Sequence, residues 1–197
     1  MGDCENLKSL FSMKESRCLP ELMSISIYNC QELEYIVAEN EELVQQPNAE
    51  VYFPKLAHVE VKRCNKLKSL FPVAMVKMLP QLSTIHIFDA TQFEEVFRNG
   101  GGGITVNEME VVLILPNLTE ITLNFLPSFV HICQGCKLQA VKLQQINIYE
   151  CPKIAPSVKE IQVTKRFFIC TFSKEFKYIN FYFFFGMTNV NMFIYRV

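Results

Sequence analysis

The stretch Leu79-Pro80-Gln81-Leu82-Ser83-Thr84-Ile85-His86-Ile87-Phe88-Asp89-Ala90 contains the pattern on which the whole chain is built. An apolar residue and a proline precede Leu82, and two isoleucines follow that leucine at offsets of three and five residues. The same phrase recurs at Leu19–Cys30, Phe53–Cys64 and Leu115–Leu126, and without its proline at Ala140–Cys151. A chain that repeats one strand-sized phrase is predicted to fold by stacking its repeats.

The spacing of the phrases indicates the class of repeat. The first long apolar position of each phrase falls at Leu22, Leu56, Leu82, Leu118 and Leu143, so the spacings are 34, 26, 36 and 25 residues. The short spacings lie within the range of leucine-rich repeats, roughly 20 to 29 residues. The long ones indicate insertions at residues 38–50 and 98–110, the second with four consecutive glycines. A weaker sixth phrase is predicted at Val158, Ile161 and Val163.

Within each phrase, the alternation of apolar and polar residues predicts a short strand with one face in the core. A small residue and then Leu or Ile follow, as in Cys30-x-x-Leu33-x-x-Ile36, and we expect them to turn the chain and fill the core. The predicted fold is therefore an α/β solenoid. It is a leucine-rich-repeat horseshoe with a short parallel sheet on the concave face and mostly irregular convex segments, with a helical turn at Phe71–Lys77.

Two segments are predicted. Residues 1–164 form a leucine-rich-repeat domain of about five to six repeats that begins in mid-repeat, because Cys4–Phe11 resembles Cys64–Phe71. We interpret this beginning as that of a fragment or a truncated gene product. Residues 165–197 form an aromatic-rich tail outside the repeat fold, with 12 aromatic residues. Translated non-coding sequence, a membrane anchor at Tyr178–Val197, a capping strand and a disordered tail remain alternatives for it.

Composition narrows the classes of partner and compartment. The formal net charge of −1 gives no support to a nucleic-acid partner, and a membrane is not an expected partner either. Eight cysteines are present. Cys30, Cys64 and Cys151 occupy one position of successive repeats, where a buried thiol behaves as a small hydrophobic group. With no disulfide framework evident, we expect a reducing, cytoplasmic location.

Catalytic and cofactor motifs are not found in the sequence. The four glycines at 100–103 are not followed by the Gly-Lys-Ser/Thr of a phosphate loop. One Cys-x-x-Cys pair, Cys133 and Cys136, supplies half of the four ligands of a structural zinc site. The three histidines are in no recognisable nucleophile–base arrangement. We therefore expect no enzymatic activity, no cofactor and no bound metal.

The outward positions of the predicted strands remain as a candidate protein-binding surface. They form columns of polar, charged and aromatic residues on a rigid support, and such residues often anchor interfaces. The alternative is an ordinary solvated sheet face. The predicted binding residues are Ser26, Tyr28, Glu60, Lys62, Arg63, His86, Phe88, Thr122, Asn124, Asn147 and Tyr149.

The phrase Leu-Pro-x-Leu-x-x-Ile-x-Ile-x-x-Cys-x-x-Leu, together with Lys66-Leu67-Lys68-Ser69-Leu70-Phe71, resembles a known family. It is similar to the C-terminal leucine-rich repeats of plant intracellular immune receptors of the coiled-coil, nucleotide-binding class, over about residues 3–164. The resemblance implies a module that senses pathogen effectors or effector-modified host proteins and restrains the receptor. Its partner would be an effector, a guarded host protein or the receptor's nucleotide-binding domain. A generic leucine-rich-repeat adaptor is the alternative. The chain lacks the coiled coil and phosphate loop, so nucleotide switching does not carry over.

Overall fold

The computed structural model describes residues 2–4, 6–12, 19–38, 53–99, 111–153, 161–162, 167–173 and 176–183. For Ser12 and for every described residue after Lys153, it describes the backbone alone. The predicted insertions at residues 38–50 and 98–110 lie almost wholly outside the described residues, as does the predicted core residue Ile154.

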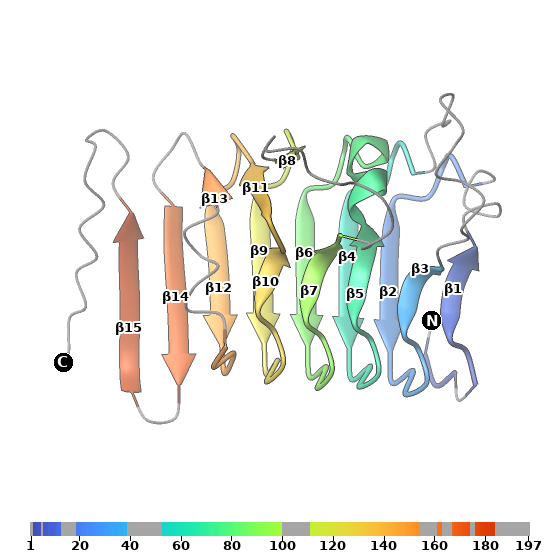
Figure 1. Ribbon diagram of the computed structural model, residues 1–197, viewed down its shortest axis with the longest axis horizontal. Helices are drawn as coiled ribbons and strands as arrows, with labels where there is room; N and C mark the ends of the chain where they lie inside the picture. Colours follow the sequence, from blue (N-terminus) through green and yellow to red (C-terminus); the bar gives the residue numbers. More distant parts are fainter. Residues whose placement is uncertain are drawn as a thin grey trace.

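A sheet of seven strands forms one side of the molecule (Figure 1). Its order is β15-β14-β12-β9-β6-β4-β2, and neighbouring strands are parallel except for the antiparallel pair β14 and β15. The strands are β2 (Ser24–Tyr28), β4 (His58–Lys62), β6 (Thr84–Phe88), β9 (Glu120–Asn124), β12 (Gln145–Tyr149), β14 (Phe167–Ser173) and β15 (Phe176–Phe183). Each of the five repeated phrases thus contributes one strand, as the sequence predicts.

The register of these strands aligns equivalent residues of successive repeats. Ile25 pairs with Val59, which pairs with Ile85, and the row continues through Ile121 to Ile146. The residues of this row are buried, whereas the neighbours of each along its strand are more exposed in β2, β4, β6 and β12. The predicted alternation of inward and outward positions is therefore confirmed for these strands.

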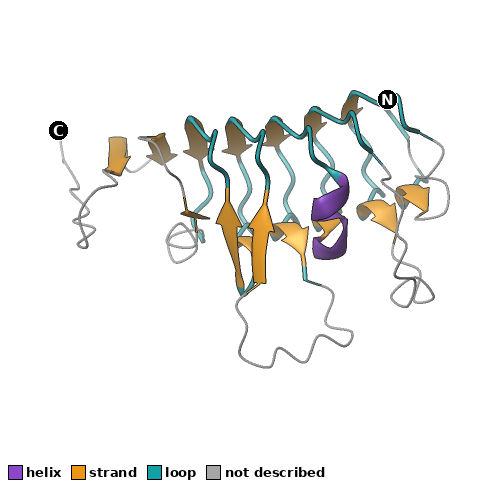
Figure 2. Cartoon of the chain, turned by 90° about the horizontal axis from the view of Figure 1, so that it is seen from above, coloured by secondary structure: helices purple, strands orange, loops and turns teal. Residues whose placement is uncertain are grey.

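A second, five-stranded sheet lies on the other side of the core (Figure 2). It is parallel, with the order β1 (Ser9–Ser12), β3 (Tyr35–Ala38), β5 (Ser69–Pro72), β7 (Glu95–Arg98) and β10 (His131–Cys133). The prediction of mostly irregular segments on this side is wrong, because the chain continues from the buried Leu or Phe after each turn into a short strand. The curvature of a horseshoe stays a prediction.

A three-stranded sheet and one helix complete the described elements. The sheet has the order β13 (Ile161–Gln162), β11 (Cys136–Gln139) and β8 (Val111–Ile114). The predicted helical turn is present as the 3-10 helix η3 (Val73–Met78), which follows β5. The sixth phrase was wrongly placed by the sequence: Ile161 pairs with Leu138 of β11, and β14 occupies the place beside β12.

The core fills the space between the sheets. The leucine that opens the phrase is buried at positions 56, 82, 118 and 143, and the return residues Leu33 and Ile36 are fully buried, as predicted. Phenylalanine rings of successive repeats contact one another at tilted angles. The ring centroid of Phe53 lies 5.6 Å from that of Phe11 and 6.4 Å from that of Phe71. Each repeat therefore buries its apolar face against its neighbours, as repeat proteins do.

Residues beyond 164 continue the seven-stranded sheet through their backbone. β14 pairs with β12 in parallel, and β15 pairs with β14 (Figure 1). The boundary at residue 164 and the proposed origins of the tail stay predictions. Within the residues that the structure describes, no helix has the length and apolarity needed to cross a membrane.

Candidate functional site

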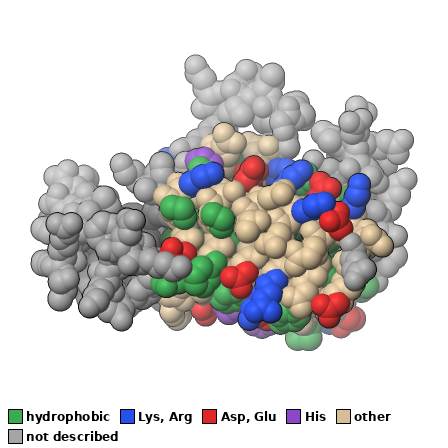
Figure 3. Space-filling model, turned by 90° about the horizontal axis from the view of Figure 1, so that it is seen from below, with side chains coloured by type: hydrophobic (Ala, Val, Ile, Leu, Met, Phe, Trp, Pro, Cys, Tyr) green, Lys and Arg blue, Asp and Glu red, His purple; other side chains and the backbone are tan. Residues whose placement is uncertain are grey.

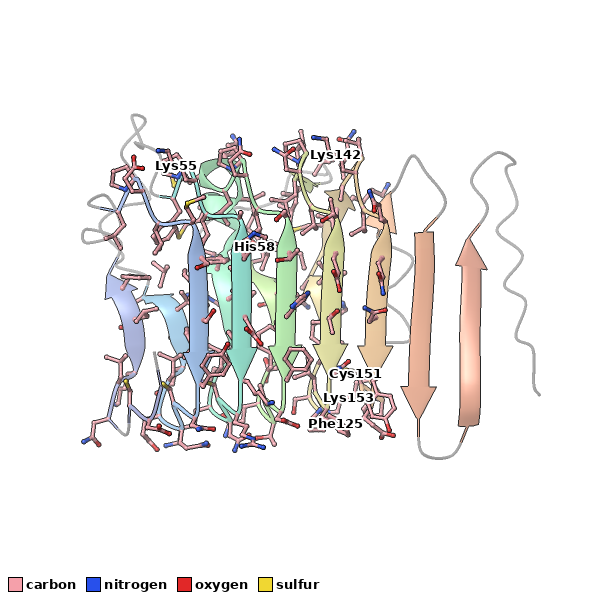
Figure 4. All side chains as sticks on the ribbon, turned by 180° about the vertical axis from the view of Figure 1, so that it is seen from behind. Lys55, His58, Phe125, Lys142, Cys151 and Lys153 are labelled. Carbon is pink, nitrogen blue, oxygen red and sulfur yellow. The ribbon has the colours of Figure 1, made fainter. Side chains whose placement is uncertain are left out.

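The outer face of the seven-stranded sheet carries three columns of side chains, defined by the strand register (Figure 4). The first column comprises Ser24, His58, Thr84, Glu120 and Gln145. The central column comprises Ser26, Glu60, His86, Thr122 and Asn147. The third column comprises Tyr28, Lys62, Phe88, Asn124 and Tyr149. The structure thus aligns ten of the predicted binding residues into the second and third of these columns.

Hydrogen bonds link the central column to the first one around Glu120. The Thr122 hydroxyl donates to Oε1 of Glu120 at 3.1 Å, and the Asn147 side-chain amide donates to the Thr122 oxygen at 3.0 Å. His86 Nε2 lies 3.4 Å from the same Glu120 oxygen, an ion pair when the imidazole is protonated. Glu120 therefore connects three strands, and this part of the surface is held in one arrangement.

Sequence reasoning missed Glu120 because the first column was left out of the predicted site. His58 and Thr84 of this column are also joined, with Nδ1 and Oγ1 2.7 Å apart. The available signal was the two-residue period itself, which puts position 120 on the same face as Thr122. The hydrogen bonds between strands could not be read from the sequence, because they depend on the register.

Aromatic and charged groups concentrate in the third column. The Tyr28 hydroxyl donates to Oε2 of Glu60 at 2.6 Å. This hydrogen bond raises the pKa of the Tyr28 phenol, so the phenol stays a neutral donor. The Phe88 ring lies 6.2 Å from the His86 ring, edge to face. These side chains are half-buried and form a mixed polar and aromatic surface, the composition that favours protein contacts.

Arg63 differs from the other predicted binding residues because it lies outside the strands. The sequence grouped it with Asn29, Asp89, Phe125 and Glu150 as a further outward column. These residues instead begin the turns, with φ between 52° and 58°, the left-handed region. Their amides continue the ladder: the Arg63 amide donates to the Phe88 carbonyl at 3.0 Å. Asn and Asp at two of the positions were a usable sequence signal, because they tolerate this conformation.

The repeated cysteines are buried, as predicted, and they also donate hydrogen bonds. The thiols of Cys30 and Cys151 donate to the carbonyls of Tyr28 and Tyr149, two residues earlier, at 3.4 Å each. Burial raises the pKa of the Cys64 and Cys151 thiols to about 11. A thiol with so high a pKa stays protonated at neutral pH and is a poor nucleophile.

The Cys-x-x-Cys pair connects two sheets. Cys133 ends β10 and Cys136 begins β11, with Gly135 between them at a φ of 69°. Both cysteines are buried and neither forms a disulfide. Among the residues that the structure describes, no group of His, Cys, Asp or Glu side chains is arranged to hold a metal ion. The three columns of the seven-stranded sheet offer a partner hydrogen bonds and ring contacts.

Comparison with known proteins places the chain in a family. The sequence model of one family, plant disease resistance protein RPS2-like leucine-rich repeats, matches residues 38–158. No curated protein and no solved structure matches the chain. The matched region contains the strands β4, β6, β9 and β12 and thus most of the three columns. The chain belongs to the RPS2-like family of leucine-rich repeats from plant disease resistance proteins.

Proposed function

We propose that this chain is the recognition module of an intracellular plant immune receptor and acts in the cytoplasm without catalysis. It binds a pathogen effector, or a host protein that an effector has modified, through the outer face of the seven-stranded sheet. The match to a family of plant disease resistance proteins supports a role in immunity. Leucine-rich repeats are generally protein-interaction modules, which supports a protein ligand. The observation that carries the proposal is the alignment of polar and aromatic residues across five strands.

The geometry favours a protein ligand over a small molecule. The columns extend across neighbouring strands that are spaced about 4.8 Å apart, so five strands present a surface about 19 Å wide. Tyr28 and Phe88 lie at the same position of β2 and β6, with Lys62 of β4 between them. Aromatic residues beside a charge are typical of the anchors of protein interfaces.

The test is a binding measurement with matched variants. The full chain is immobilised and exposed to a panel of purified pathogen effectors and of host proteins with and without effector treatment. The triple variant Tyr28→Ala, Lys62→Ala, Phe88→Ala is expected to weaken binding of any captured partner by about tenfold or more. Its circular dichroism spectrum is expected to match that of the unmodified chain, because all three side chains point away from the core.

The control variant replaces one tyrosine and one lysine on the opposite side of the core. Tyr35 lies in β3 of the five-stranded sheet, and Lys68 immediately precedes β5. The double variant Tyr35→Ala, Lys68→Ala is expected to bind the partner normally. The proposal would be overturned if the control variant lost the partner while the triple variant kept it. It would also be overturned if no protein in the panel bound the chain.

We also propose that the repeats restrain the receptor until a ligand binds. The coding sequence upstream of codon 1 tests the premise that the repeats belong to such a receptor. A nucleotide-binding domain with Gly-Lys-Ser or Gly-Lys-Thr in the same reading frame is the expected finding. An F-box-like helical segment there would instead assign the repeats to a substrate-selecting adaptor.

A further inference from the structure

A groove lies along the edge of the seven-stranded sheet where its strands end, outside the three columns. Its volume is about 370 Å³. The lining includes Asp89, Phe125 and Glu150, which begin three successive turns, and Pro127 and Pro152, which follow in two of those turns. Figure 3 looks onto this edge and shows hydrophobic side chains gathered toward its C-terminal part, with acidic side chains beside them. The groove therefore combines apolar walls with negative charge.

The charged residues that line the groove are all acidic. Its lining holds two carboxylates and no Lys, Arg or His. The Glu150 oxygen Oε1 is buried and has no hydrogen-bond partner within the described part of the chain. Neither Asp89 nor Glu150 belongs to any ion pair among the described residues. A buried acceptor without a partner is unfavourable, and the groove presents its two acidic residues with no cation of its own in the lining. A cationic ligand would complement that charge.

An exposed aromatic residue occupies the turn between the two acidic residues. Phe125 begins the turn between those of Asp89 and Glu150, because its amide donates to the Tyr149 carbonyl and the Asp89 amide donates to the Asn124 carbonyl. Phe125 is 43% exposed, and its ring lies 4.9 Å from the Tyr149 ring, edge to face. Since neighbouring strands are about 4.8 Å apart, the backbones of Asp89 and Glu150 are about 10 Å apart, with the backbone of Phe125 between them.

The turn conformation fixes where Phe125 lies. Its φ of 56° is shared with the equivalent residues of the other repeats, so it belongs to the repeat turn and is not special to the groove. Phe125 directly follows β9, at the edge of the sheet where the strand ends (Figure 4). The turn therefore places the Phe125 side chain at the rim of the groove that it lines.

We propose that this groove binds an arginine side chain of a partner protein. A guanidinium group is planar, stacks on an aromatic face and donates paired hydrogen bonds to a carboxylate, which a lysine ammonium does not match. Phe125 contacts the face of the guanidinium, Glu150 and Asp89 accept its hydrogen bonds, and the two prolines contact the aliphatic stem. This inference rests on the proposed protein-binding function and adds a second contact surface to it.

The experiment uses two acetylated and amidated pentapeptides, Ala-Ala-Arg-Ala-Ala and its citrulline analogue, with the isotope-labelled full chain. Citrulline keeps the shape of arginine and removes its charge. We expect saturable amide shift changes at Thr91, Phe125 and Glu150 with the arginine peptide, and binding about tenfold weaker with the citrulline peptide. Equal binding of the two peptides, or no saturable shifts at these residues, would overturn the inference.

Variants locate the site. Glu150→Gln and Phe125→Ala are each expected to weaken binding of the arginine peptide several-fold with an unchanged circular dichroism spectrum. Glu21→Gln is the control, because Glu21 pairs with Lys55 at the opposite edge of the sheet, 2.6 Å from its Nζ. Unchanged peptide binding by Glu150→Gln would place the peptide elsewhere and reject the groove.

The same peptides separate this inference from the proposed function. The triple variant of Tyr28, Lys62 and Phe88 leaves the groove intact and is expected to bind the arginine peptide normally. If the unmodified chain does not bind the arginine peptide but the triple variant loses the protein partner, the groove alone is rejected. If the chain binds the arginine peptide but the triple variant binds the protein partner normally, the sheet face alone is rejected.

Discussion

At the scale of single residues, the residue that begins each turn is the most strained part of the repeat. Asp3, Asn29, Arg63, Asp89, Phe125 and Glu150 all have φ between 52° and 58°. Asn and Asp adopt this region with little penalty, whereas Arg, Phe and Glu are expected to lose about 1 kcal/mol or more each. Three of the six repeats therefore keep a turn that their local sequence disfavours, because neighbouring repeats hold it through the ladder.

Arg63→Gly is predicted to stabilise the protein by about 0.5–1 kcal/mol, because glycine enters the left-handed region without a steric penalty. Urea unfolding followed by circular dichroism measures the change. Lys62→Gly is the control, one residue earlier in the extended strand β4, and it is expected to destabilise. Equal destabilisation by both variants would contradict the role assigned to the turn.

The buried thiols predict a dependence on alkaline pH. The pKa of Cys64 and of Cys151 is raised from 9.0 to about 11, so the folded state keeps protons that the unfolded state loses. The stabilising contribution is therefore complete below pH 9 and is lost as the pH rises through 11. The loss is at most about 3 kcal/mol per thiol. Urea unfolding at pH 8, 9, 10 and 11 measures it.

Cys64→Ala provides the comparison for this pH series. Ala90 fills the equivalent position of the next repeat and is fully buried, so the backbone accepts alanine there. We expect the variant to fold, to be somewhat less stable at pH 8 and to lose less stability between pH 9 and 11. An identical pH profile would show that the Cys64 thiol does not contribute.

At the scale of elements, the five strands that the repeated phrases contribute to the seven-stranded sheet could be predicted, and those of the five-stranded sheet could not. β6 alternates buried and half-buried residues with a period of two. β3 and β7 instead have two consecutive buried residues, Ile36-Val37 and Val96-Phe97, between partly exposed ones. Four residues without alternation carry no strand signal, and only pairing with the neighbouring repeat makes them strands.

Ile85→Asp in β6 is predicted to destabilise the fold by about 4 kcal/mol or more, because the carboxylate would be buried without a partner. Ile85 is fully buried between the equivalent Val59 and Ile121. Chemical unfolding and near-ultraviolet circular dichroism detect the loss. Ser24→Asp is the control, since Ser24 is exposed and its cross-strand neighbour is His58, and it should change stability little. A stable Ile85→Asp protein would reverse the assignment of faces.

The misplaced sixth phrase shows a different limit of sequence reasoning. Val158, Ile161 and Val163 have the spacing of a strand that should pair with β12. The structure pairs Ile161 with β11 and gives the edge of β12 to β14. The β14 segment is Phe167-Phe168-Ile169-Cys170-Thr171-Phe172-Ser173, a nearly continuous apolar run without the repeated phrase, so the phrase alone could not find it. The competition is decided by pairing partners, which the sequence of one strand does not contain.

At the scale of the whole molecule, stability is a sum of contacts between neighbouring repeats. The central strand β6 is paired on both sides, by β4 and β9. The strand β2 has β4 on one side and, among the described residues, only the bridge from Gly2 to Tyr28 on the other. Opening of the N-terminal repeat therefore breaks fewer contacts than opening of the middle.

Hydrogen exchange is predicted to reflect this difference. The slowest amides of β6 should exchange at least about tenfold more slowly than the slowest amides of β2, since local opening requires less free energy near an end. Exchange followed by nuclear magnetic resonance resolves both strands. Equal protection in the two strands would mean that the repeats unfold as one unit.

The candidate site divides in the same way between what one repeat determines and what the stack determines. The outward direction of Tyr28, His86 and Phe88 follows from the phrase within a single repeat. The hydrogen bond between Glu120 and Asn147 needs the register of β9 and β12, and the groove needs three successive turns. Sequence reasoning therefore recovers the members of the second and third columns and misses the contacts between strands.

The identical turn at the end of each strand has an evolutionary consequence. The repeats leave the sheet through a residue in the same left-handed conformation, and its amide donates to a carbonyl of the next strand at Asp3, Asn29, Arg63, Asp89 and Phe125. These repeats therefore present the same junction to whichever neighbour follows. Residues 4–36 align without a gap to residues 64–96. Unequal crossing-over within such a gene can add or delete paired repeats without creating a new junction, and it brings new side chains into the columns while the framework stays intact.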